Sequence, residues 1–444
     1  MAVLCAAASD FWGRQLGGAG RERATGVAAD RGGGVYVAGR IEGEATLGSV
    51  RVTSNGPDAL VTALDRYGQP LWAHAFGGPG ADEARAVAIL TEGDVFVTGS
   101  FSGTVDFDPG PGRTELVSGG ASDVFVLRLS PRGELVWVRG LGGAQADEGF
   151  DVAVDAEGVY VAGTFRGTLQ AGTVRLESAG RTDGFALALD PAGAPRWARR
   201  IGGPEDDEAR SVAVTPDGQV WVVGSFEAKA GFGGSETATL ESAGKSDAFV
   251  ARLGTDGALV WSGRLGGKHA DAAQAVVANN SSVWVTGRFQ RTADFDPGPT
   301  ATSMSATAET DAFVVRLAST GHLRWVRQAG GARHDFGTGI ALDRYGGVWV
   351  TGVSEAKSQA AGPDPEWGDD RSWLTHFDRD GERKTPRDMA AEGGIRTLDL
   401  TLDSAGNPCL AGVFQGQATL STGAEIVRLP GAGKTDALVA RVLP

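Results

Sequence analysis

Residues 210–226 read RSVAVTPDGQVWVVGSF, two apolar segments joined by a Pro-Asp-Gly turn. This is the pattern of two neighbouring β-strands. The Val-aromatic-Val run that precedes Gly224 recurs along the chain at intervals of 60 to 65 residues, with a degenerate last copy. The seven copies end at Gly39, Gly99, Gly163, Gly224, Gly287, Gly352 and Gly412. Self-similarity at such a period indicates a repeat architecture.

Each repeat carries two further strand signals. In the fourth repeat, residues 247–257 (DAFVARLGTDG) and residues 259–267 (LVWSGRLGG) predict a third and a fourth strand. A polar segment of about twenty residues, which we expect to be a loop, precedes the third strand. Four strands per repeat are typical of a propeller blade. The sequence therefore predicts an all-β fold, a seven-bladed β-propeller with four-stranded blades.

The two ends of the chain fall within a repeat and not between two repeats. The chain opens with a fourth strand, FWGRQLGG at residues 11–18, and ends with a third strand, DALVARV at residues 436–442. We expect the N-terminal strand to pair with the C-terminal blade, closing the ring and covering exposed sheet edges. On this interpretation residues 10–444 form a single propeller domain. Residues 1–9 are expected to be a disordered or processed N-terminal stub.

Two aromatic positions recur once per repeat, and large aromatic side chains in repeats are expected to pack blades together. The second-strand position holds Tyr36, Phe96, Tyr160, Trp221, Trp284 and Trp349, with Cys409 in the last repeat. The fourth-strand position holds Trp12, Trp72, Trp137, Trp197, Trp261 and Trp325, with Thr385 in the degenerate copy.

The net charge limits the classes of partner that we expect. The chain has 41 Lys and Arg against 55 Asp and Glu, a net charge of −14. Nucleic acid is not an expected partner, because phosphate binding needs clustered basic residues. The apolar runs are short, so no transmembrane segment is expected. The sequence leaves the oligomeric state open.

The order of motifs resembles a known family. It runs W-x-R-x-x-GG, D-E, V-A-V-D-x-x-G-x-V-Y-V-x-G, DFDPGPG and S-G-x-x-D-x-F-V-x-R-L, and the pattern covers the chain from Trp12 onward. It resembles the bacterial SBBP β-propeller repeats, and is similar in places to S-layer-like surface glycoproteins. The resemblance implies an extracellular or cell-surface protein, with a cytoplasmic one as the alternative. It supplies no catalytic residues.

An acid follows each Gly-Gly pair in six repeats. A second set of acids opens the third strands at Asp58, Asp123, Asp183, Asp247, Asp311 and Asp436, and should emerge on the same face. The two sets could form a binding face for cations or a cationic ligand. Alternatively, each carboxylate accepts backbone N–H groups and fixes its glycine-rich loop. The acids after Gly-Gly are Glu22, Asp82, Asp147, Asp207, Asp271 and Asp335.

The motif DFDPGPG at residues 106–112 has a near copy at residues 294–300. Its carboxylates, Asp106 and Asp108 in one copy and Asp294 and Asp296 in the other, could bind calcium through oxygen ligands. The spacing lacks the further acids of an EF-hand loop. Aspartates that cap a Pro-Gly turn explain the motif equally well.

Two other groups are candidate binding residues. His269 and His334 fall in equivalent loops of adjacent repeats and could form a composite site, or be two exposed histidines. The segment 354–373 breaks the repeat consensus and adds an aromatic ring with charged residues, a composition suited to binding carbohydrate or protein. Drift in an unconstrained surface loop is the alternative. The added residues are Trp367, Asp369, Asp370 and Arg371.

These observations favour a non-catalytic recognition or scaffold protein that binds a protein or glycan on its loop-bearing face. This step rests on fold analogy. A propeller enzyme, a lyase or hydrolase acting at the mouth of the central channel, is the first alternative. A calcium-stabilised structural module is the second. Clustered His, Arg and acidic side chains at the inner strand ends would favour the enzyme, whereas a channel lined by Val, Ala and Gly would favour the scaffold.

Overall fold

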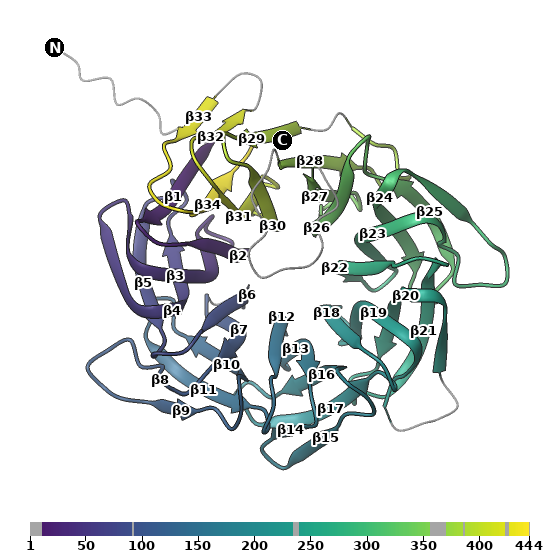
Figure 1. The fold of residues 1–444 in the computed structure, drawn as a ribbon, viewed down its shortest axis with the longest axis horizontal. Coiled ribbons are helices and arrows are strands. Elements are labelled where there is room, and N and C mark those ends of the chain that lie inside the picture. The colour runs from purple at the N-terminus through teal and green to yellow at the C-terminus, as the bar shows by residue number, and fades with distance from the viewer. Residues whose placement is uncertain are drawn as a thin grey trace.

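The architecture is all-β and propeller-like. The computed structural model describes residues 11–90, 93–233, 239–355, 370–384, 387–421 and 426–443. Within these ranges the chain forms β-strands, turns and loops, without a helix. Figure 1 shows the strands in radial groups around a common centre, with the N-terminal strand beside the C-terminal ones.

The strands fall into four concentric positions (Figure 1). The innermost are β2 (Arg23–Ala29), β6 (Glu83–Ile89), β12 (Glu148–Asp155), β18 (Asp207–Val214), β22 (Ala272–Asn279), β26 (His334–Leu342) and β30 (Ile395–Leu402). The second are β3 (Val35–Leu47), β7 (Val95–Phe101), β13 (Gly158–Phe165), β19 (Val220–Gly231), β23 (Ser282–Asp294), β27 (Val348–Glu355) and β31 (Pro408–Phe414). The third are β4 (Val50–Leu64), β10 (Asp123–Leu129), β16 (Asp183–Leu189), β20 (Thr239–Leu253), β24 (Ser303–Ala318), β28 (Arg371–Phe377) and β34 (Asp436–Arg441). The fourth are β5 (Pro70–Phe76), β11 (Leu135–Leu141), β17 (Pro195–Ile201), β21 (Leu259–Gly267), β25 (Leu323–Gln328), β29 (Arg387–Ala391) and β1 (Trp12–Gly18).

The strands of a group pair antiparallel from the inside outward, as in the order β12-β13-β16-β17. Each innermost strand contacts the next one along the chain from β2 to β30, and β30 contacts β2. The two ends of the chain meet in one sheet. β1 pairs antiparallel with β34, with Trp12 opposite Arg441 and Leu16 opposite Ala437.

The prediction of polar loops between the second and third strands is wrong in most groups. These segments form two-stranded ribbons, either by lengthening both strands or as the separate hairpins β8 (Thr104–Asp106) with β9 (Glu115–Val117), β14 (Thr168–Ala171) with β15 (Val174–Glu177), and β32 (Ala418–Ser421) with β33 (Ile426–Leu429). A segment with many polar residues can form such a ribbon, because only alternate residues of a ribbon face the core. On β24 these residues are Met304 and Ala306.

The second strands are apolar throughout because both faces of each sheet are covered. On β19, Val220 and Val222 pack into the core shared with the preceding group, beside Tyr160. Trp221 and Val223 pack into the core shared with the following group. The recurring Val-aromatic-Val run therefore supplies both interfaces at once.

The fourth-strand tryptophan joins each group to the next. Trp197 on β17 donates its indole N–H to the carbonyl of Thr255 at 3.0 Å, and Arg199 donates to the carbonyl of Gly257 at 2.8 Å. These carbonyls lie in the turn between β20 and β21 of the next group. Gly257 has φ of 75°, and a Cβ there would lie 2.5 Å from the indole ring. Donation to the same turn recurs for Trp12, Trp72, Trp137 and Trp325.

We predict that Trp197→Ala lowers the free energy of unfolding by about 3–5 kcal/mol, the usual cost of removing a buried Trp. The side chain is 6% exposed and forms an inter-group hydrogen bond. Urea denaturation followed by circular dichroism measures the change. Tyr345→Ala, at a position that is 73% exposed, is the matched control and should shift stability by less than about 0.5 kcal/mol. Equal effects of the two substitutions would contradict the role of Trp197 in joining neighbouring groups.

We also predict that deletion of residues 10–18 strongly lowers the melting temperature. The deletion removes β1, together with the buried Phe11, Trp12 and Leu16, and leaves one edge of β34 unpaired. Differential scanning calorimetry and size-exclusion chromatography would report lower stability and association of the exposed edges. A truncated protein that melts like the intact chain would refute the role of β1.

Candidate functional site: an inner charged ring

The acids that follow the Gly-Gly pairs lie buried where the innermost strands begin. Glu22, Asp82, Asp147, Asp207, Asp271 and Asp335 are at most 2% exposed. Each accepts the N–H of the glycine four residues earlier, as Asp271 does from Gly267 at 2.7 Å. The other oxygen of Asp271 accepts the N–H of Gln290 at 2.9 Å. These carboxylates tie each connecting loop to a second strand.

The third-strand acids lie beside this first set. A Cβ on Gly202 would lie 2.2 Å from Asp183 Oδ1 and 2.7 Å from Asp207 Oδ2, so both carboxylates border this glycine. The same crowding occurs at Gly266 with Asp247 and Asp271. The first glycine of each Gly-Gly pair is therefore required by the carboxylates packed against it.

Burial makes these acid pairs hold protons unusually tightly. It raises the pKa of Asp147, Asp207 and Asp271 to about 7 and that of Asp183 to about 6, and repulsion within each pair adds to the shift for the first three. In the described structure Oδ1 of Asp183 is buried without a hydrogen-bond partner, as are the Oδ1 atoms of Asp58, Asp123, Asp247 and Asp311. A proton held by the pair can satisfy such an oxygen.

The geometry supports the loop-fixing interpretation of these acids. A partner on this face would meet the loop backbone around the buried carboxylates. A direct cation-binding role for the two acid sets stays a prediction.

Charged side chains gather on the innermost strands, just after the buried acids. Every innermost strand shifts register against its neighbour three residues past the acid position. Such β-bulges redirect a side chain out of the ladder. We use the name inner charged ring for Arg23, Glu83, Arg85, Glu148, Glu208, Arg210, Arg288, Glu355 and Arg396, with the rings of Phe150 and Phe336.

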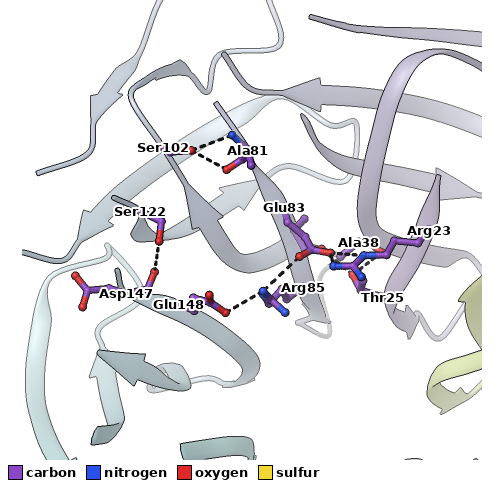
Figure 2. Close-up of polar contacts among 11 residues, drawn as sticks. Arg23, Thr25, Ala38, Ala81, Glu83, Arg85, Ser102, Ser122, Asp147 and Glu148 are labelled. Carbon is purple, nitrogen blue, oxygen red and sulfur yellow. Dashed lines mark hydrogen bonds and ion pairs between the residues drawn. The ribbon is translucent and has the colours of Figure 1, made fainter. Parts of the chain in front are cut away.

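One arc of this ring links three innermost strands. Figure 2 shows Glu83 of β6 between Arg23 of β2 and Arg85 of its own strand, with Glu148 of β12 beyond. Arg85 lies 3.4 Å from Glu83 and 2.9 Å from Glu148. Burial opposes ionisation of Glu83, but Arg85 and Arg23 hold its pKa below the ordinary value.

Aromatic rings continue the arc. Phe150 on β12 lies under two guanidinium groups, Arg85 at 5.2 Å and Arg210 at 4.4 Å from the ring centre. Arg210 also forms a 2.6 Å ion pair with Glu208. Arg288 on β23 lies 5.5 Å from the centre of the Phe336 ring on β26.

The remaining arc involves the end of the irregular segment. Arg396 on β30 binds Asp370 at 2.6 Å and Glu355 at 3.1 Å. His334 is opposite Glu355 in the β26–β27 register, and its Nδ1 is buried without a hydrogen-bond partner in the described structure. In this group Arg371 occupies the third-strand acid position, opposite Ser354, and Ile395 occupies the first-set position.

The predicted histidine pair and the irregular segment have different outcomes. Within the described residues no hydrogen bond or ring contact joins His269 to His334. Trp367 and Asp369 lie outside the described residues. Asp370 is 3% exposed and bound to Arg396, so it serves an internal ion pair. Arg371 is exposed at the start of β28.

The two DFDPGP copies form capped turns with a buried ring. Asp106 accepts N–H groups from Asp108 and Thr114, and Asp294 accepts them from Asp296 and Thr302. Asp108 and Asp296 each accept the N–H of the glycine two residues on. The ring of the intervening Phe107 packs against Phe125, with 5.0 Å between the ring centres. Turn capping accounts for these aspartates, and calcium binding stays a prediction.

The described residues contain no group of three or more His, Cys, Asp or Glu arranged to hold a metal ion. They also contain no helix long and apolar enough to span a membrane.

The inner charged ring was not identified from the sequence. Its members are one or three residues past the first-set acid position, or, for Arg288 and Glu355, on second strands, and their meeting depends on the bulges. A signal was present, because the residue after the acid is Glu83, Glu148 or Glu208 in three repeats and Arg23 in another. The ring holds arginines and acids, and His334 lies opposite its member Glu355, a combination that we expected of the enzyme alternative.

Fold and strand pairing define an all-β protein of the β-propeller class. The resemblance to the SBBP repeats is confirmed, because residues 324–356 match the family model described as SBBP, β-propeller repeat.

Similarity to other proteins is distant. The chain is 27% identical over 252 residues to the regulatory protein FlaEY of Caulobacter vibrioides, a match that covers 50% of this chain and 25% of that protein. Hydrazine synthase of Kuenenia stuttgartiensis is similar over 92% of this chain and 96% of its own, with 11% identity and a TM-score of 0.47. A virginiamycin B lyase from Staphylococcus aureus is similar over 98% and 100%, with 7% identity and a TM-score of 0.45.

The acid pairs predict an unusual dependence of stability on pH. A carboxyl group whose pKa is about 6–7 when folded and about 4 when unfolded binds more protons in the folded state between those values. Its contribution to stability is therefore largest at low pH and is lost as pH rises toward 7 and above. We expect the melting temperature to be higher at pH 6 than at pH 8.

Asp183→Asn tests the origin of that dependence. The asparagine oxygen can still accept the N–H of Ala179, while its amide can donate toward the Asp207 carboxylate. We expect a raised melting temperature at pH 8 and a smaller difference between pH 6 and pH 8. Asp256→Asn, in an exposed turn, is the control. An unchanged pH dependence in Asp183→Asn would show that the acid pair does not cause it.

Proposed function

We propose that this protein is a recognition scaffold, a seven-bladed propeller closed by β1, that binds a protein or glycan over the inner charged ring. The seven sequence repeats and the β1–β34 pairing support the blade number and the closure. The observation that carries the function is the gathering of arginines, acids and two phenylalanines from several innermost strands.

The acids of the ring favour binding over catalysis. Glu83, Glu148, Glu208 and Glu355 each lie within 3.1 Å of an arginine nitrogen. The ion pairs restrict these side chains, and Arg85 and Arg23 hold the pKa of Glu83 below its ordinary value, so Glu83 in particular is poorly suited to exchange protons with a substrate. A rigid mosaic of both charges with aromatic rings suits specific recognition.

The distant relative supports a protein partner. FlaEY is described as a regulatory protein, a role that such a scaffold could fulfil by binding another protein. We place the protein outside the cell or at its surface, on the resemblance to SBBP repeats. Calcium at Asp106, Asp108, Asp294 and Asp296 would be structural in this proposal.

A propeller lyase or hydrolase is the second candidate, and one observation favours it. His334 lies opposite Glu355, which pairs with Arg396, and it has a buried ring nitrogen without a hydrogen-bond partner in the described structure. A general base could be built from this group. If the protein turned over a ligand, His334→Gln would abolish turnover and leave binding intact.

We predict that the double variant Arg85→Gln/Arg210→Gln loses the partner. Both guanidinium groups lie over Phe150, so the change removes two positive charges at one point of the ring. Affinity capture from envelope and lysate of the source cells, followed by mass spectrometry and glycan analysis, compares the variant with the native chain. The control is Arg113→Gln/Arg324→Gln, an equal loss of charge at exposed positions. Equal recovery by all three proteins would place the binding site elsewhere.

A further inference from the structure

Arg288 differs from the other arginines of the inner charged ring in having no counter-ion. Arg23, Arg85, Arg210 and Arg396 each lie within 3.1 Å of a carboxylate oxygen. In the described structure no carboxylate oxygen lies within 4.0 Å of an Arg288 nitrogen. Arg40, at the equivalent repeat position, also lacks an ion pair, but the charge of Glu83 is near it.

The surroundings of Arg288 hold it in place without neutralising it. Its guanidinium rests on the Phe336 ring at 5.5 Å, and the side chain is exposed to solvent. The positive charge of Arg210 acts on it from the preceding innermost strand. The negative charges of Glu208, Glu355 and Asp271 act on it from beyond ion-pair distance. An exposed guanidinium that is held by an aromatic ring and has no ion-pair partner can bind an anion.

The neighbouring groups select the kind of anion. The negative charges of Glu208, Glu355 and Asp271 act on Arg288, and they disfavour a dianionic phosphate. A single carboxylate matches the single uncompensated charge and can accept two parallel hydrogen bonds from a guanidinium. The half-buried rings of Phe336 and Phe150 offer apolar contact beside it. This combination fits an acidic residue next to an apolar one in a polypeptide.

We propose that Arg288, seated on Phe336, binds a carboxylate of an acidic peptide segment of the partner protein. This inference rests on the proposed recognition function and names the chemistry of its ligand. The carboxylate occupies the face of the guanidinium fork that has no ion pair, and the adjoining apolar side chain contacts Phe336. Specificity then follows, because a peptide without the carboxylate leaves Arg288 uncompensated.

The test uses two peptides that differ by one charge, N-acetyl-Leu-Glu-Leu-amide and N-acetyl-Leu-Gln-Leu-amide. Saturation-transfer NMR titrations measure their affinities for the full chain and for three variants. We expect the native protein to bind the Glu peptide at least about tenfold more tightly than the Gln peptide, or about 1.4 kcal/mol. Arg288→Gln should abolish this preference, Arg288→Lys should keep part of it, and Arg324→Gln on the exposed side of β25 should keep all of it.

The outcomes separate the alternatives. Because Arg288 forms no ion pair in the described structure, Arg288→Gln should melt within about 2 °C of the native protein, which excludes misfolding as the cause. Equal affinity for both peptides, or an undiminished preference in Arg288→Gln, overturns the proposal. Preference for glucuronate or inorganic phosphate over the Glu peptide also overturns it, in favour of an acidic sugar or a phosphate. Capture of a partner that Arg288→Gln does not weaken would leave the recognition function standing and the carboxylate site refuted.

Discussion

The contact between a fourth-strand tryptophan and a turn glycine of the next strand group is the interaction on which the arrangement depends. At Trp197 and Gly257 the ring occupies the space that a side chain would need, while the indole and the neighbouring Arg199 hydrogen-bond the turn carbonyls. The contact therefore fixes both the separation and the angle of adjacent groups. Where the sequence replaces Arg by Gly263 after Trp261, the ring still crowds Gly321, so the packing survives without the guanidinium.

A second set of contacts divides structural positions from variable ones. The acids beside each Gly-Gly pair hold the loops from within, and this role needs the same residue type in nearly every repeat. The positions one and three residues further on are free of that role. They carry Arg23, Glu83, Phe150 and Gln274 in different groups. The charge and shape of the inner charged ring therefore differ from one group to the next. The constant acids build the frame on which the variable residues are displayed.

The repeat period and the alternation of apolar residues sufficed to predict the strands, the propeller-like class and the pairing of the chain ends. They failed where exposure or register decides the outcome. For Asp207 and Asp271 the sequence left a cation-binding face and a loop-fixing role open, and their burial against glycine supports the second. The outer ribbons read as loops because one of their faces is solvated. Arg85 and Phe150 could not be placed together from the sequence, because a bulge of one residue decides where each side chain points.

The pairing of β1 with β34 also has a consequence for biosynthesis. About 430 residues separate Trp12 from Arg441, so at 5–20 residues per second roughly 20 to 90 seconds pass between the synthesis of the two partners. During that interval β1 can pair only with β3, through Gly17 and Gly18, and the edge that later joins β34 keeps unsatisfied backbone groups. The nascent chain therefore exposes an unpaired strand edge, which can associate with other chains, for most of its translation. Ribosome-associated chaperones would be expected to act on this segment until its distant partner emerges.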